Sequence, residues 1–222
     1  MRRSGEHRPF DRLRGRAHVF AVALGLLLAL AGCTETPSVV RSTDVPGPVA
    51  VPADQTSAPN PDLTAAKKAA GIADCPATEA APAKGGLPDV RLECLGGGRS
   101  VGLADLRGPT LVNVWASWCG GCREEAPFLA EASRPGSAVS LIGVDHADPA
   151  PEEAVKFAGS AGWTYPQLYD ADLVFRTRLQ VTGLPVTFFV RPDGTLAGRH
   201  AGPFTSSQQL ADLSRQYLGV AP

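Results

Sequence analysis

Residues 118–122 constrain the fold of this chain more than any other feature, because they place two cysteines one helical turn apart. An apolar, β-branched run at residues 110–115 predicts a buried strand directly before them, and residues 123–132 predict a helix directly after them. Cys119 is therefore expected at the helix start, where unpaired backbone N–H groups and the positive end of the helix dipole favour a thiolate. The pattern predicts a redox pair in which Cys119 is the nucleophile and Cys122 resolves the mixed disulfide.

Two other uses of such a pair stay open at this point. A structural zinc site needs about four ligands. The remaining candidate ligands offer no second closely spaced pair: Cys33, Cys75, Cys94, His146 and His200. A purely structural bridge is disfavoured too, because closing so short a loop removes little chain entropy from the unfolded state. The sequence favours an exposed, easily reduced pair and predicts neither a metal nor another cofactor.

A second motif lies downstream, where Gly-Leu-Pro at residues 183–185 precedes a strongly apolar run at residues 186–190. The run predicts a strand, and residues 191–195 predict the turn of a hairpin that continues over residues 196–200. A proline in this place usually begins a strand. Read together with the two cysteines, however, the motif resembles the cis-proline loop of the thioredoxin superfamily, in which the residue before the proline presents its backbone to an extended substrate.

With these motifs the chain resembles the TlpA/ResA-like, membrane-tethered thiol-disulfide oxidoreductases of the thioredoxin superfamily, over roughly residues 87–218. The resemblance implies an α/β thioredoxin fold with an N-terminal hairpin and an inserted strand-helix element. It implies that Cys119 and Cys122 form the redox-active disulfide.

The same resemblance implies a substrate-binding set around the reactive sulfur. Trp118 would shield the sulfur, and Leu184 and Pro185 would dock the substrate.

Three further positions bear on how the pair would work. Gly121 stands where many relatives have proline, so loop rigidity and reduction potential do not carry over from them. Asn113 occupies the strand position where thioredoxin has a buried, proton-handling aspartate, so that role must lie elsewhere or with water. Glu125, three positions after Cys122, matches an acidic residue of the TlpA/ResA branch. It is interpreted either as a catalytic carboxylate that manages protons or as a helix-start carboxylate stabilised by the dipole.

The N-terminal segment predicts export. Six arginines within residues 2–16 precede a short apolar run at residues 19–31, which ends in small residues before Cys33. A basic region, an apolar stretch too short to span a membrane comfortably and small residues before a cut are typical of a signal peptide. Because cysteine follows the predicted cut, the segment resembles a bacterial lipobox, which implies that Cys33 is lipidated. The alternative is an uncleaved signal anchor.

These signals divide the chain into a lipoprotein signal peptide (residues 1–32), a lipid-anchored tether (residues 33–86) and a thioredoxin-like domain (residues 87–222). The tether is rich in proline and alanine and has no sustained apolar period, although residues 62–70 could form one or two helical turns. Removing the signal peptide takes six of the 21 basic and two of the 22 acidic residues, which leaves 15 and 20, a charge of −5. That balance gives no indication of nucleic-acid binding.

Alternation of apolar runs and helical patterns within the domain predicts an α/β sheet. The expected elements are a hairpin (residues 90–93 and 100–102), a strand (139–145), a helix (151–161), a short strand (167–169) and two helices (172–179 and 206–218). Residues 149–179 would supply the inserted element.

Cys75 and Cys94 form a second pair of a different kind, nineteen positions apart. In an exported protein such a pair predicts a structural disulfide, worth roughly 3 kcal/mol in the chain-entropy model. The alternative is a relay dithiol that exchanges with Cys119 and Cys122, although nothing in the sequence makes either thiol acidic.

The sequence as a whole predicts exchange with protein thiols and disulfides at the outer face of the bacterial cytoplasmic membrane. By resemblance the direction is more often reduction, with apocytochrome c as one substrate and a membrane electron carrier that re-reduces the pair. Two rivals stay open. A thiol peroxidase would want threonine where Ala116 stands, and a redox-inert binding lipoprotein would tolerate the loss of either cysteine.

Overall fold

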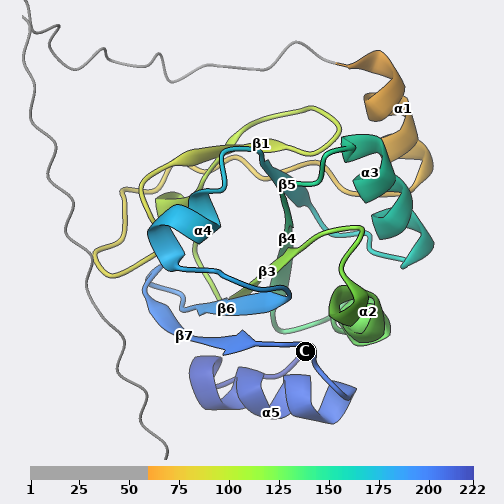
Figure 1. Cartoon of the computed structure of the whole chain (residues 1–222). Helices are drawn as coiled ribbons and strands as arrows, with labels where there is room; N and C mark the ends of the chain where they lie inside the picture. The colour runs from red at the N-terminus through yellow and green to blue at the C-terminus, as the bar shows by residue number, and fades with distance from the viewer. Residues whose placement is uncertain (1–59) are drawn as a thin grey trace, which may run out of the picture. The chain divides into compact units, whose positions relative to one another are not determined.

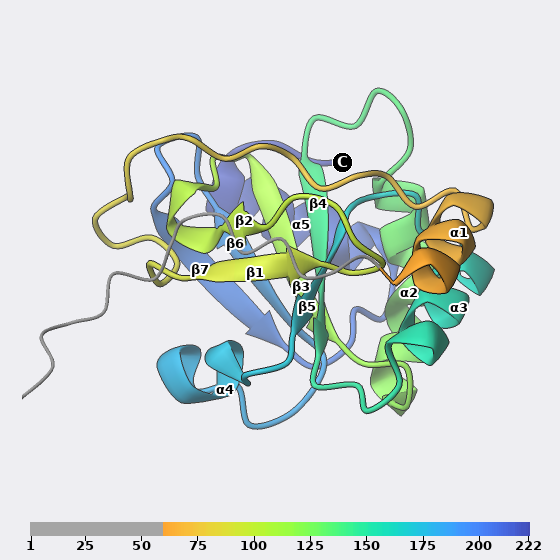
Figure 2. The same ribbon diagram turned by 90° about the horizontal axis from the view of Figure 1, so that it is seen from above.

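The computed structural model describes residues 60–222, which build a seven-stranded sheet with helices on both faces (Figures 1 and 2). The strands are β1 (Arg91–Cys94), β2 (Val101–Gly102), β3 (Thr110–Trp115), β4 (Ser140–His146), β5 (Gln167–Asp170), β6 (Val186–Val190) and β7 (Leu196–Ala201). The helices are α1 (Pro61–Ala69), the 3-10 turn η1 (Leu103–Asp105), α2 (Gly120–Ala132), α3 (Pro151–Ser160), α4 (Val174–Leu179) and α5 (Ser207–Leu218).

The strand order is β2-β1-β5-β4-β3-β6-β7. Strands β3, β4 and β5 run parallel, and the remaining neighbours pair antiparallel. All six residues of β3 are buried, as expected for a central strand that is covered on both faces. The prediction of a thioredoxin fold is confirmed, with β1 and β2 as the N-terminal hairpin and β5 as the inserted strand between β4 and β1.

The core consists of two clusters, one on each face of the sheet, because successive side chains of a strand point to opposite faces. On the first face, which we call the α2 face, Leu111 and Trp115 of β3 pack with residues of α2, α3 and α5. On the second, the α4 face, Val112 and Val114 pack with Phe175 of α4 and with η1. Both redox-relevant cysteine pairs lie in these clusters, one pair in each.

The segment before the domain differs from the tether prediction, which extended to residue 86. Asn60 caps α1 by accepting hydrogen bonds from two backbone N–H groups, and α1 lies beside α3 (Figure 2). Lys67 and Ile72 are buried, and the Ala73 N–H donates to the Thr164 carbonyl at 2.9 Å. The chain from residue 60 onward therefore packs on the domain instead of hanging free of it, because these contacts compensate for its proline content.

The predicted signal peptide, Cys33 and the first part of the tether lie outside the described residues. Within residues 60–222, none of the helices combines the length and the apolarity needed to cross a membrane.

Candidate active site

Cys119 and Cys122 are joined by a disulfide at the start of α2, with their Cα atoms 5.3 Å apart. Cys119 is the N-cap residue, and its sulfur accepts a hydrogen bond from the Cys122 N–H at 3.1 Å. The pair is less exposed than the sequence indicated, with Cys119 5% and Cys122 0% accessible. Cys119 is therefore the sulfur of this pair that a partner can reach, and it sits where the helix N-terminus favours a thiolate.

Trp118 precedes the reactive cysteine and projects into solvent. Its side chain is 61% exposed, the one large hydrophobic side chain of residues 60–222 that stands out in this way. An exposed aromatic beside a reactive sulfur offers apolar contact area to a partner polypeptide. This placement agrees with a role in substrate binding more than with a role as a lid over the sulfur.

The loop that carries Trp118 is held by two charged side chains that belong to none of the sequence motifs. The Ser117 N–H donates to the Asp148 carboxylate at 2.7 Å, and the Arg123 guanidinium donates to the Ser117 carbonyl. The same guanidinium lies 4.9 Å from the centre of the Phe157 ring. Two charged side chains thus hold the backbone N–H and the carbonyl of one residue, which fixes the orientation of the loop. Neither contact leaves a pattern in the sequence, since both depend on the tertiary fold.

The Leu184–Pro185 peptide bond is cis, which confirms the predicted cis-proline loop. The loop lies against the thiol helix at Gly121, where an added Cβ would come within 3.2 Å of Pro185 Cδ. Glycine at this position therefore lets the two motifs approach closely. The loop is also tied to the residue after β7 by a hydrogen bond from the Gly202 N–H to the Pro185 carbonyl at 2.9 Å.

An open groove of about 360 Å³ begins at this loop. It is lined by residues 180–186, Arg199, Ala201 and Gly202, so that Leu184 and Pro185 form part of its wall. Pro185, in the wall of this groove, also faces Gly121 of the thiol helix. The arrangement can accommodate an extended polypeptide segment beside Cys119.

Glu125 lies inside the molecule and not at the helix surface. One carboxylate oxygen accepts a hydrogen bond from the Asn113 amide at 2.8 Å and the other from the Phe204 N–H at 3.1 Å. Burial raises the pKa of Glu125 to about 7, because the loss of hydration outweighs the two hydrogen bonds that lower it. A carboxyl that titrates near neutrality, one turn from Cys122 on the same helix, favours the proton-handling interpretation over the surface-dipole one.

Asn113 thus has Glu125 as a hydrogen-bond partner, which its position in the sequence did not indicate. Its amide group also donates to the Thr187 hydroxyl at 3.0 Å, while its carbonyl oxygen finds no protein partner within residues 60–222. A polar residue in the middle of an otherwise apolar, central strand was the available signal, because such a side chain must be paired inside the core. Asn113 therefore holds the Glu125 carboxylate inside the core.

A Glu125→Gln variant should keep its fold and slow thiol-disulfide exchange by roughly 10- to 100-fold, because the amide cannot take up or release a proton. The alkylation rate of the reduced thiols against pH is the measurement, and the component near pH 7 should disappear. Glu124→Gln, which removes an exposed neighbour, is the matched control. Superimposable profiles for wild type and Glu125→Gln would contradict a proton-handling role.

A second buried carboxylate, Asp145, was also missed. It lies at the end of β4 in register with Trp115, and both of its oxygens lack a hydrogen-bond partner among the described residues. Burial raises its pKa to about 8, helped by the charges of Asp148 and Asp170. Asp145 is therefore protonated at neutral pH, and its only sequence signal is a charged residue at the end of an apolar run.

The second cysteine pair is joined as well. Cys75 and Cys94 form a disulfide with a Cα–Cα distance of 5.9 Å, buried on the α4 face. Cys119 and Cys122 belong to the α2 face. Direct exchange between the two pairs of one chain would require the sheet between them to open, which argues against the relay interpretation.

Comparison with known proteins places this site in a family. Residues 82–216 match the model of the Redoxin family. The chain is 39% identical over 138 residues to the thiol:disulfide interchange protein HelX of Rhodobacter capsulatus, covering 60% of this chain and 76% of the relative. It is 34% identical over 117 residues to the thiol:disulfide interchange protein DsbE of Yersinia pestis, covering 51% of this chain and 61% of the relative.

Among solved structures, the fold resembles a secreted Mycobacterium tuberculosis disulfide oxidoreductase homologous to Escherichia coli DsbE. The TM-score is 0.50 and the identity 26%, over 58% of this chain and 94% of that one.

Proposed function

The chain belongs to the Redoxin family and is a thiol-disulfide oxidoreductase of the thioredoxin superfamily, and from this premise we propose that it reduces protein disulfides outside the cytoplasm while anchored to the membrane through Cys33. The observation that carries the proposal is the position of Cys119. It is the reachable sulfur at a helix N-terminus, between an exposed tryptophan and a cis-proline groove. That surface is suited to an extended polypeptide with a disulfide.

The proposed reaction has two displacement steps. The Cys119 thiolate attacks one sulfur of the substrate disulfide, forms a mixed disulfide and releases the other substrate sulfur as a thiolate. Glu125 then takes the proton of the Cys122 thiol, and Cys122 attacks the Cys119 sulfur, which releases the second substrate thiol and leaves the pair oxidised. A carboxyl with a pKa of about 7 can accept a proton in one step and return it in the next.

Apocytochrome c is the substrate we propose, and a membrane-bound dithiol carrier is the electron donor that restores the pair. The support is the similarity to thiol:disulfide interchange proteins such as HelX, together with a docking surface that is suited to extended, unfolded chains. No other class of partner is needed to close the cycle, since each turnover consumes one dithiol and one disulfide.

The equilibrium reduction potential of the Cys119–Cys122 pair tests the direction. A value near roughly −270 mV, close to thioredoxin, is expected for a reductase. A value near roughly −120 mV would mean that the protein oxidises its substrates and would overturn the proposal. A second test follows reduction of a disulfide-containing apocytochrome c peptide by the reduced protein, with a Cys119→Ser variant as the inactive control.

Cys33, and neither Cys75 nor Cys94, should carry the anchor, because Cys33 alone follows an export segment with small residues before the cut. A Cys33→Ala variant should lose labelling by a fatty-acid analogue and should accumulate unprocessed, while its Cys119–Cys122 pair stays active. Fractionation of cells that express each form is the measurement. Recovery of the wild-type protein as an unlipidated, freely released species would rule the anchor out.

A further inference from the structure

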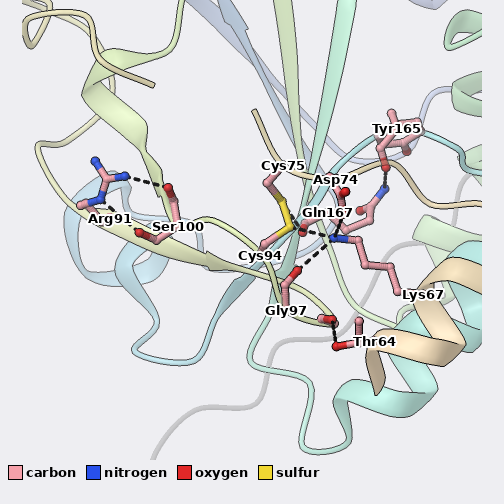
Figure 3. Close-up of a disulfide and its surroundings, with 11 residues drawn as sticks. Thr64, Lys67, Asp74, Cys75, Arg91, Cys94, Gly97, Ser100, Tyr165 and Gln167 are labelled. Atoms are coloured by element: carbon pink, nitrogen blue, oxygen red, sulfur yellow. Dashed lines mark hydrogen bonds and ion pairs between the residues drawn. A yellow bond between two sulfur atoms is a disulfide. The ribbon is translucent and has the colours of Figure 1, made fainter. Parts of the chain in front are cut away.

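The second disulfide lies next to a buried lysine, as Figure 3 shows. Lys67 of α1 is 3% exposed, and its ammonium nitrogen is 3.1 Å from the Cys94 sulfur. The same nitrogen is 3.1 Å from the Gly97 carbonyl oxygen and 3.2 Å from an oxygen of Asp74. A full positive charge is therefore placed in direct contact with one sulfur of a neutral bond.

Burying an ammonium is costly unless a negative charge compensates for it. The Asp74 carboxylate does so only weakly, because its side chain is 94% exposed and water screens the pair. The Gly97 carbonyl supplies a dipole and no charge. The group that would gain most from the ammonium is the Cys94 sulfur, once the disulfide opens and that sulfur becomes a thiolate.

The surroundings of the other sulfur are the opposite. Cys75 Sγ lies 3.4 Å from the Gln167 carbonyl oxygen, which can accept a hydrogen bond from a thiol but repels a thiolate. After reduction, the surroundings would therefore stabilise a thiolate at Cys94 and a thiol at Cys75. A bond that serves only as a structural staple has no need of this asymmetry.

We propose that Cys75–Cys94 is a second redox-active disulfide of this protein, and that it accepts two electrons from a dithiol partner. A thiolate of the partner attacks the Cys75 sulfur, and Cys94 leaves as a thiolate that Lys67 neutralises. The second thiol of the partner loses its proton and attacks the partner's own first sulfur, and Cys75 leaves and is protonated. The products are the partner's disulfide, a thiol at Cys75 and a thiolate at Cys94, and the proton lost by the partner's second thiol equals the one that Cys75 takes up. Lys67 speeds the first step because a better leaving thiolate leaves faster.

Burial does not argue against exchange at this site. Cys75 and Cys94 are 6% and 5% exposed, the same as the 5% of Cys119. This pair lies on the α4 face, in a different core cluster from the Cys119–Cys122 pair. Reduction would also release the connection between the segment after α1 and strand β1. The chain would then have two redox sites, and the redox state of each could be measured separately.

The test uses the full wild-type chain, equilibrated in buffers of reduced and oxidised dithiothreitol. After quenching, differential alkylation and peptide mass spectrometry report the fraction of Cys94 that is reduced, separately from Cys33, Cys119 and Cys122. The native pair should be reducible without unfolding. Lys67→Met should lower the equilibrium constant for reduction about tenfold, which corresponds to about 30 mV, and should move Cys94 alkylation to higher pH.

Two controls separate charge from packing. Lys68→Met removes an exposed neighbouring charge on α1 and should leave the midpoint unchanged. Thr64→Val removes the 2.8 Å hydrogen bond from the Thr64 hydroxyl to the Gly96 carbonyl, which loosens α1 while keeping Lys67, and should shift the midpoint far less than Lys67→Met. Equal midpoints for Lys67→Met and wild type, or a pair that is reduced only after denaturation, would overturn the proposal. A Thr64→Val shift as large as that of Lys67→Met would do so as well.

Discussion

Cys122→Ser protein should accumulate long-lived mixed disulfides between Cys119 and its protein substrates, whereas Cys119→Ser protein should trap almost none. Both variants should lose turnover by about a thousandfold or more, since each lacks one half of the dithiol. The asymmetry follows from the geometry. Cys119 caps the helix and is the accessible sulfur, while Cys122 lies in the first turn with no exposed surface. Without Cys122, nothing inside the chain can displace the trapped partner.

Non-reducing gels of cell extracts, followed by identification of the bands that vanish with reductant, measure this trapping. Each variant should also carry Cys75→Ser and Cys94→Ser, so that the second disulfide contributes no bands. Better trapping by Cys119→Ser than by Cys122→Ser would reverse the assignment of nucleophile and resolving thiol. Trapping by neither would mean that the substrate is not a protein disulfide, and the proposed function would fail.

The oxidised protein should lose several kcal/mol of stability as the pH rises from 5 to 8.5. Glu125 and Asp145 have folded-state pKa values of about 7 and about 8, above their unfolded values of 4.5 and 3.8. A carboxyl whose pKa is raised by folding stabilises the protein below its unfolded pKa, and this contribution is lost as the pH rises through the folded pKa. Between pH 5 and 8.5 the expected loss is on the order of 2 kcal/mol for Glu125 and 4 kcal/mol for Asp145.

Urea unfolding at several pH values checks this expectation. Asp145→Asn should remove most of the decline in the free energy of unfolding with pH, and Glu125→Gln should remove a smaller part. Neither amide has a proton to lose in this pH range. Asp172→Asn, at an exposed position, serves as the control and should follow the wild-type curve. If stability rose between pH 5 and 8.5 in the wild type, the two carboxyls would not be neutral when buried.

The parts of the site that were predictable from sequence are those fixed by local chemistry. A strand, two cysteines and a helix start follow one another within residues 110–132, so the position of Cys119 depends on neighbours in the chain. The loop at Pro185 is predicted from its own motif and its apolar strand, taken together with the two cysteines. In both cases the residues that determine the geometry lie within a few positions of the residue concerned.

The parts that were missed depend on distant residues. Glu125 was ambiguous because its burial requires Asn113, twelve positions earlier, and the backbone of Phe204, 79 positions later. The sequence predicts residues 60–86 as part of the tether, because composition reflects proline content and carries no sign that Lys67 contacts Cys94. Only the folded sheet brings these groups together.

The exposure of Trp118 also gives the protein a native optical probe. The chain has three tryptophans, and the other two, Trp115 and Trp163, are fully buried in one aromatic cluster. A water-soluble quencher such as iodide should therefore quench the fluorescence of Trp118 and leave that of the two buried tryptophans unchanged. When a substrate covers the surface beside Cys119, the Trp118 fluorescence should become protected from iodide. Substrate binding could then be measured in unlabelled protein at equilibrium, before any disulfide is exchanged.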